Sequence, residues 1–218
     1  MERTELDEII ALLRARYPDG DKCSLGFNSA FQLLVSTILS AQCTDVRVNK
    51  VTPALFTRFP DAASMAASDI DELESLIKSC GLYHSKAVNI RNCARMIVDD
   101  FGGEVPDNLD DLVKLPGTGR KTANLVMGEW YKEPAYVIDT HVKRIWHLLG
   151  ISDSTSPETI ERDLRALIPP DDPSAADALA LSHLLITHGR STCVAGRPDC
   201  GNCCLKEHCA AFTRHIAL

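Results

Sequence analysis

The sequence predicts an all-α protein of about ten helices, and three observations support this prediction. Apolar residues recur at helical spacing along most of the chain, between residues that commonly begin and end helices. Only 135–138 resembles a strand, and it is short. Hydrophobic residues make up 45% of the 218 residues and charged residues 24%, which is an ordinary globular composition.

Polar residues mark the expected helix starts, because their side chains can accept hydrogen bonds from first-turn amides. In chain order, we expect helices to begin at Ser29, Ser68, Ser85, Asn108, Ser156 and Ser174. Gln32 would complete a capping box with Ser29. Glycine closes helices because it readily adopts the left-handed conformation, and it marks expected ends at Gly81, Gly102 and Gly189.

Charge and hydropathy limit where the protein can act. No apolar run reaches the roughly 20 residues that span a bilayer. The acidic stretch 1–8 has no signal-peptide core, so we expect an intracellular, cytoplasmic protein without a membrane partner. A net charge of −7 is unusual for a nucleic-acid enzyme. Between positions 114 and 144, however, there are six Lys or Arg and only three Asp or Glu, so this part of the surface could still be positively charged.

Nine cysteines divide into two groups. Four are scattered through helical sequence, where we expect reduced, buried thiols: Cys23, Cys43, Cys80 and Cys93. The other five fall between 193 and 209, and such bunching favours a metal site over a disulfide framework.

The bunched group contains the pattern Cys193-x6-Cys200-x2-Cys203-x5-Cys209. Structural zinc sites usually combine two short cysteine pairs, whereas only one short pair occurs in this pattern. Four thiolates suit an iron–sulfur cubane, although the spacing alone leaves zinc open. We interpret Cys204 as a bystander, because using it would lengthen the short pair.

The string Leu115-Pro-Gly-Thr-Gly-Arg-Lys-Thr-Ala-Asn124 predicts a tight turn between two helices. Gly117 and Gly119 leave their amides unshielded near a helix N-terminus, which is a favourable place for a phosphate oxygen. An ordinary helix–helix turn is the alternative. The complete string favours a helix-hairpin-helix that grips a nucleic-acid backbone without reading its sequence.

Two charged residues near this hairpin are candidates for chemistry. Lys121 lies in the first turn of the second helix, where it would be a phosphate contact, a surface charge or a Schiff-base nucleophile. Asp139 precedes another helix and could be only its N-cap. A carboxylate held in this way could also stabilise the positive charge that develops on a sugar when its base leaves.

With these motifs, the chain resembles the endonuclease III family. The similarity is carried by 39–50 (LSAQCTDVRVNK), 81–87 (GLYHSKA), 115–124, 137–144 (VIDTHVKR) and the cysteine pattern, in the family's order. It implies a two-lobed helix-hairpin-helix glycosylase fold. One lobe would be a six-helix barrel at 23–133, and a discontinuous lobe, 1–22 with 134–218, would carry a [4Fe–4S] cluster.

The resemblance also implies a function and a set of site residues. The family consists of bifunctional DNA glycosylases and abasic-site lyases, which act on oxidised pyrimidines in double-stranded DNA. By similarity, Lys121 is the nucleophile, Asp139 assists it, and the four cysteines hold the cluster. Gln42 and Leu82 would fill the gap left by a flipped nucleotide. A monomer suffices for one flipped base.

Two features bear on the subclass. Adenine-mismatch relatives lack the lysine and carry a glutamate where this chain has Thr37, which favours the lyase. The loop 194–199 is less basic than is usual in the family, since Asp199 offsets the candidate DNA contact Arg197, and we expect weakened DNA binding. Two alternatives stay open: a glycosylase for thymine or uracil mismatches, or a DNA-binding protein with little turnover.

Overall fold

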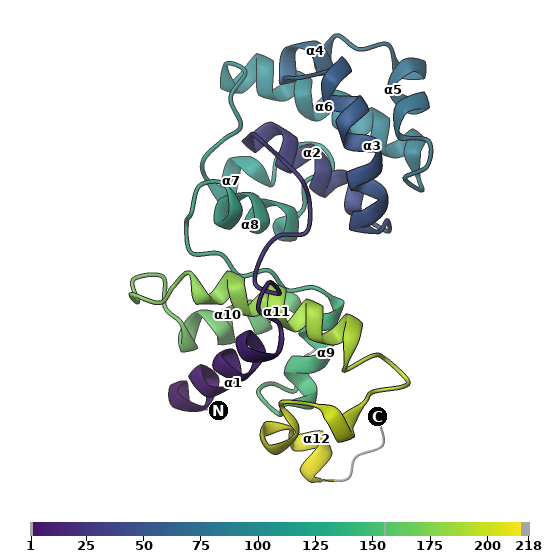
Figure 1. Cartoon of the computed structure of the whole chain (residues 1–218). Helices are drawn as coiled ribbons and strands as arrows, with labels where there is room; N and C mark the ends of the chain where they lie inside the picture. Colours follow the sequence, from purple (N-terminus) through teal and green to yellow (C-terminus); the bar gives the residue numbers. More distant parts are fainter. Residues whose placement is uncertain (1, 155, 215–218) are drawn as a thin grey trace. The chain divides into compact units, whose positions relative to one another are not determined.

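The computed structural model describes residues 2–154 and 156–214 (Figure 1). Within these ranges, twelve α-helices and two short 3-10 helices form all of the regular structure. The described residues include no strand, and 135–138 is irregular, so the predicted all-α class is confirmed. None of the described helices combines the length and apolar character needed to cross a membrane.

The chain divides into two compact units, one of residues 23–132 and one of 1–22 together with 133–218. The first, which we call the hairpin unit, contains α2 (Ala30–Ser40), α3 (Asp45–Arg58), α4 (Ala62–Ala66), α5 (Ile70–Ile77), α6 (Tyr83–Phe101), α7 (Leu109–Leu112) and α8 (Arg120–Glu129). The assignment of these units to a barrel lobe and a cluster lobe stays a prediction.

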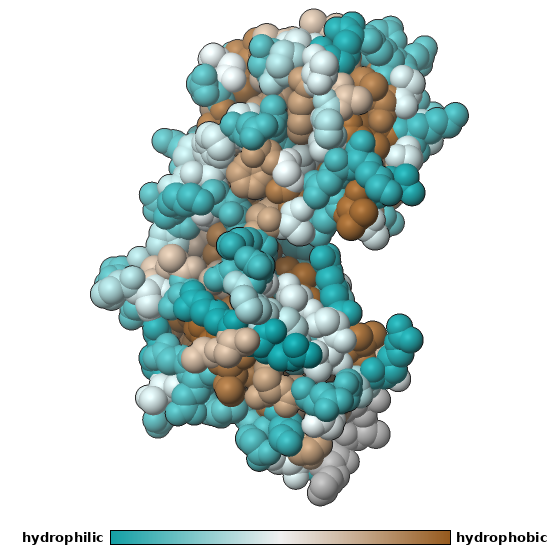
Figure 2. Space-filling model, viewed as in Figure 1, coloured by the Kyte–Doolittle hydropathy of each residue, from teal (hydrophilic) through white to brown (hydrophobic). Residues whose placement is uncertain are grey.

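Helix α2 lies in the core of the hairpin unit. Eight of its eleven residues are buried, because apolar side chains occupy nearly every face of the helix. It packs against α3, α6 and α8. The same core buries Cys80 and Cys93 completely. Hydrophilic side chains predominate on the face shown in Figure 2.

The second unit, which we call the cysteine unit, is built from both ends of the chain. It contains α1 (Arg3–Arg16), α9 (Thr140–Leu148), α10 (Pro157–Leu167), α11 (Asp177–Ser191), α12 (Ala210–Thr213) and the 3-10 helices η1 (Cys200–Asn202) and η2 (Lys206–His208). Its core contains Leu6, Leu13, Trp146 and Leu181, each with no exposed surface. The apolar face of α1 is therefore buried by residues that are distant in sequence.

Three predicted helix starts are confirmed. Ser29 accepts a hydrogen bond from the Gln32 amide (3.1 Å), and Asn108 and Ser156 cap α7 and α10 in the same way. The capping box at Ser29 is incomplete, because the Gln32 side chain accepts from the Asn28 amide instead. Gly102 closes α6 with a φ of 63°, as predicted.

The other three predicted starts are wrong. Asp69, not Ser68, caps α5, because its carboxylate accepts from the two amides that follow. Helix α6 begins at Tyr83, two residues before Ser85, after a left-handed residue. Helix α11 begins at Asp177. The Ser174 hydroxyl is engaged by Arg3 and Asp172, so it caps no helix.

Candidate functional site

The predicted hairpin forms a tight turn between α7 and α8. Gly117 has a φ of 80°, a left-handed conformation that favours glycine. A Cβ atom at Gly117 would lie 3.0 Å from Asn89 Cβ and 3.3 Å from Ile38 Cγ2. The turn is therefore packed closely against α6 and α2, and its shape depends on the missing side chain.

Gly119 has a different role from Gly117. Its φ of −92° is accessible to any residue, and a Cβ atom there would meet nothing within 4 Å. It is the N-cap of α8 but has no side chain to accept from the first-turn amides. The helix start is therefore exposed on this side, which suits the approach of a phosphate oxygen to these amides.

Lys121 is the second residue of α8, and its side chain is exposed. The turn at Gly117 and the cap at Gly119 fix the start of the helix and thereby the direction in which Lys121 leaves it. The side chain lies at the positive end of the helix dipole, and this end favours a negatively charged phosphate. Both a nucleophilic and a phosphate-binding role remain compatible with this position.

Gln42 and Leu82 lie in two loops of the same unit, after α2 and before α6. Both are exposed, Leu82 by 60%, and both have left-handed backbones, with φ of 52° and 57°. This conformation costs about 1–2 kcal/mol for a residue with a side chain. The two loops approach each other, since a Cβ atom at Gly81 would lie 3.8 Å from the Gln42 carbonyl oxygen.

Asp139 belongs to the cysteine unit and is the N-cap of α9. Its carboxylate oxygen Oδ1 accepts from the amides of His141 and Val142, both at 2.8 Å. Two hydrogen bonds to rigid backbone groups fix the orientation of the carboxylate. The capping role predicted from the sequence is thus confirmed.

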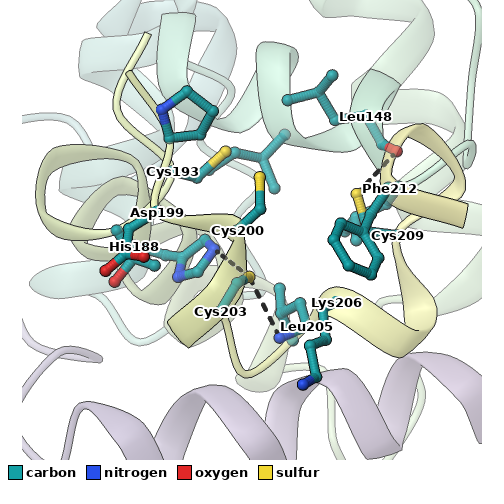
Figure 3. A pocket seen from close by; sticks show the side chains of 14 residues that line it. Leu148, His188, Cys193, Asp199, Cys200, Cys203, Leu205, Lys206, Cys209 and Phe212 are labelled. Carbon is teal, nitrogen blue, oxygen red and sulfur yellow. Dashed lines mark hydrogen bonds between the residues drawn. The ribbon is translucent and has the colours of Figure 1, made fainter. Parts of the chain in front are cut away.

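The four cysteines of the predicted pattern line one cavity of the cysteine unit (Figure 3). They reach it from different elements: Cys193 follows α11, Cys200 begins η1, Cys203 follows η1, and Cys209 follows η2. Cys204 does not line this cavity. No three His, Cys, Asp or Glu side chains among the described residues are placed to hold a single metal ion.

Polar groups that the sequence did not suggest surround this cavity. His188 Nε2 lies 3.5 Å from Cys203 Sγ (Figure 3). Its Nδ1 lies 2.9 Å from the Tyr17 hydroxyl oxygen. Burial and the nearby Arg144 lower the pKa of His188 to about 4, so the ring is neutral. The Arg144 guanidinium donates to the backbone carbonyl oxygens of Cys193 and Gly189.

Two of the thiols, those of Cys193 and Cys203, are poorly solvated. Burial raises the pKa of Cys203 to about 11 and also raises that of Cys193. In such surroundings a thiolate needs a nearby cation. The donor set therefore fits a cationic, thiophilic group that fills the cavity.

Arg197 lies in the loop between the first two of these cysteines and is exposed. Its amide donates to the Val194 carbonyl oxygen (3.1 Å), which turns the loop. Asp199 faces the cavity and accepts from the Asn202 side-chain amide at 3.0 Å. The acid that offsets Arg197 in the sequence therefore has a structural contact of its own.

The candidate residues are thus divided between the two units. The hairpin unit contains Gln42, Leu82, Gly117, Gly119 and Lys121, and Gly117 lies close to Ile38 of α2 and Asn89 of α6. The cysteine unit contains Asp139, Arg197 and the four cysteines. The supporting residues Tyr17, Arg144 and His188 were missed, although the two basic ones lie within or beside the motifs at 137–144 and 188–209.

Comparison with known proteins gives consistent results. A family model described as HhH-GPD superfamily base excision DNA repair protein matches residues 35–170. The endonuclease III of Synechocystis sp. is 49% identical over 203 residues, which cover 93% of this chain and 90% of that protein. The endonuclease III of Escherichia coli K12 is 36% identical over 209 residues, 96% of each chain.

Solved structures extend the similarity to three dimensions. A non-covalent endonuclease III–DNA complex matches with a TM-score of 0.89 at 36% identity, over 99% of both chains. A trapped endonuclease III–DNA covalent intermediate matches equally well, over all of both chains. A thermostable thymine-DNA glycosylase, 18% identical, shares the fold with a TM-score of 0.84 over 97% of this chain and 98% of that one.

Proposed function

Because the chain belongs to the endonuclease III family of base excision DNA repair proteins, we propose that it is a bifunctional DNA glycosylase and abasic-site lyase. Its substrates would be double-stranded DNA with an oxidised pyrimidine or an abasic site. The observation that carries the proposal is Lys121, an exposed amine in the first turn of a helix whose glycine-rich start suits a DNA phosphate. The predicted cytoplasmic location and monomeric state stay predictions.

In the proposed reaction, the neutral Lys121 amine attacks C1′ of the damaged nucleotide. A carbon–nitrogen bond forms, the glycosidic bond breaks, and its electron pair leaves with the base. Opening of the sugar ring gives a Schiff base. Transfer of a C2′ proton to solvent then expels the 3′ phosphate and cuts the strand, and hydrolysis of the Schiff base by water releases the sugar and restores Lys121.

Asp139 would act through its negative charge. The two backbone hydrogen bonds fix the carboxylate before the substrate arrives, so it needs little reorganisation as the sugar becomes positive. In this proposal Gln42 and Leu82 occupy the space that the flipped nucleotide leaves. An exposed leucine beside an exposed amide suits a place between stacked bases and an unpaired base.

We further propose that Cys193, Cys200, Cys203 and Cys209 hold a [4Fe–4S] cluster. Four thiols around a cavity, rather than converging on one point, fit a cubane with four corners. When bound, the cluster supplies a cross-link between four parts of the segment 193–209. That segment includes Arg197, which this cross-link would hold in place toward the DNA backbone.

Borohydride trapping tests the proposed lyase. The wild-type protein, incubated with a duplex carrying an abasic site, should give a covalent adduct on reduction, and Lys121→Ala should give none. Lys50→Ala, which removes an exposed lysine from α3, should trap like the wild type. Persistence of the adduct in Lys121→Ala would assign the nucleophile elsewhere.

Asp139→Asn separates charge from capping, because asparagine caps helices about as well as aspartate. Thermal stability should stay unchanged, while turnover falls by about 10²–10³-fold, the effect of losing one transition-state charge contact. A variant with full activity would leave Asp139 as an N-cap alone. A duplex panel with thymine glycol, thymine mismatched with guanine, and uracil would separate the proposal from a mismatch glycosylase.

A further inference from the structure

The geometry points to Lys86 as the residue that positions Gln42 and Leu82 for entry into damaged DNA. We infer that its ammonium group ties together the two loops that present these side chains. This inference rests on the proposed function, because it concerns how the protein distinguishes damaged from undamaged duplex. Lys86 lies within α6, entirely inside the hairpin unit.

Lys86 is unusual because its charged group is buried. Only 4% of the residue is exposed, and desolvation lowers the pKa of its ammonium group. A buried charge destabilises the folded state unless it is well hydrogen-bonded, and an apolar side chain of similar size is often better for stability. A role other than stability would therefore explain the lysine at this position.

The contacts of the ammonium group indicate that role. Nζ donates to the Leu39 carbonyl oxygen at 2.8 Å and to the Cys80 carbonyl oxygen at 3.2 Å. Leu39 is three residues before Gln42, and Cys80 is two residues before Leu82. One side chain thus holds both loops at the points where they leave the core.

The Leu39 contact also closes the end of α2. An α-helix leaves its last carbonyl groups without intrahelical partners. The amide that would bond Leu39 in a continued helix is that of Cys43, but it donates to the Ser40 carbonyl oxygen instead. The Lys86 ammonium donates to the Leu39 carbonyl oxygen in place of the Cys43 amide, at the negative end of the helix dipole. The chain can therefore leave the helix and turn at Gln42.

Both loops need such support because both contain strained residues. Of the described residues other than glycine, only Gln42, Leu82 and Lys132 have a positive φ. Left-handed residues persist where the surroundings fix them, and they concentrate at functional sites. Burial and the neighbouring Cys43 thiol raise the pKa of Cys80 to about 11, which indicates that these two side chains of the same loops also lie close together.

The test compares Lys86→Met with Lys78→Met. The first removes the buried ammonium but keeps most of the side-chain volume, and the second removes an exposed charge next to the same loop. Binding is measured by fluorescence anisotropy on an undamaged duplex and on one with a tetrahydrofuran abasic-site analogue, which cannot be cleaved. A 2-aminopurine opposite the analogue reports unstacking of the partner base.

For Lys86→Met we expect the preference for the damaged duplex to fall at least tenfold and the 2-aminopurine signal to be lost, while affinity for undamaged duplex changes less than threefold. Lys78→Met should weaken binding to the damaged and the undamaged duplex by similar factors, because it removes only an exposed charge. In the Lys86→Met background, Leu82→Ala should reduce the damage preference little further. Once Lys86 no longer holds the loop, Leu82 is no longer placed to enter the duplex, so the two effects are not additive.

An unchanged damage preference in Lys86→Met, or equal weakening on both duplexes, would overturn the inference. So would additive effects of Lys86→Met and Leu82→Ala. If Lys86→Met unfolds at the assay temperature, Lys86→Gln takes its place: its amide is tolerated more easily in the core, but its shorter side chain should weaken the two contacts, so the same fall in damage preference is expected. A wild-type protein that does not prefer the damaged duplex would overturn the proposed function and this inference together.

Discussion

Helix α2 and the segment 193–209 are held in place by different means. Eight of the eleven residues of α2 are buried, mostly apolar ones. Of the seventeen residues in 193–209, all of which the structure describes, Leu205 alone is buried. Helix α2 is thus positioned by packing, whereas the segment has four cysteines around a cavity where a core would otherwise be.

Because they are held in place differently, the two regions should respond to different perturbations. A packed helix needs only its own chain, and removing apolar volume destabilises it. A loop with almost no buried side chains depends on whatever its cysteines bind. The proposed cluster would therefore stabilise the segment 193–209 and leave α2 largely unaffected.

The largest effect is expected for Cys203→Ser. Loss of one ligand should abolish the visible iron–sulfur absorbance and bound iron, and should expose 193–209 to proteolysis, since metal binding and folding of such segments are coupled. Iron analysis and limited proteolysis measure both. Cys204→Ser is the matched control and should keep its iron, because that residue does not line the cavity. Equal iron loss in both variants would contradict the ligand assignment.

Leu34→Ala tests the opposite region. This α2 residue has no exposed surface, so the truncation should lower the free energy of unfolding by about 2–5 kcal/mol. Urea denaturation measures the change. Iron per folded chain should match the wild type. If Leu34→Ala loses iron while its helices remain folded, packing around α2 and iron binding by 193–209 are not independent.

The hairpin glycines offer a smaller and more selective test. Gly117→Ala should destabilise the fold by about 1–2 kcal/mol, because φ is positive and the new methyl meets α2 and α6. Gly119→Ala should cost less than about 1 kcal/mol, because its Cβ meets open space. Gly119→Ala should nevertheless weaken DNA binding, since that space is where a phosphate would lie. Unchanged affinity would argue against phosphate binding there.

The smallest effect concerns the exposed loop of the segment. Ala195→Lys should steepen the slope of log affinity against log salt by about 0.9, the contribution of one added phosphate contact. Ala195→Glu, the opposite charge at the same position, should weaken binding. Asp199 is a poorer choice for this change, because its carboxylate accepts from Asn202 beside the cavity. Identical salt slopes for both variants would place the loop away from DNA.

Much of the fold was predictable because the signals are local. The starts at Ser29, Asn108 and Ser156 and the cap at Asp139 need only neighbouring amides, and each forms as the sequence predicts. The cysteine spacing likewise identified four residues that share a cavity. The family resemblance, carried by five short motifs, agrees with relatives that match over nearly the whole chain.

One wrong helix start is local, because Asp69 caps α5 in place of the adjacent Ser68. In the other two, a distant residue overrides the local preference. Ser174 is a good cap candidate by sequence, but Arg3, far away in the chain, engages its hydroxyl. Helix α6 begins after a left-handed Leu82 because Lys86 holds the preceding loop to the end of α2. No pattern in 81–87 reveals that contact, since it depends on how α2 and α6 pack.

The discontinuity of the cysteine unit has a consequence for biosynthesis. The contact between Tyr17 and His188 joins residues 171 positions apart. As the chain leaves the ribosome, the contiguous residues 23–132 can fold first. Helix α1 is synthesised before them, but its apolar face stays exposed until the C-terminal helices have been made. Insertion of iron and sulfide would then be the final step of maturation, and a shortage of either should leave α1 a target for chaperones.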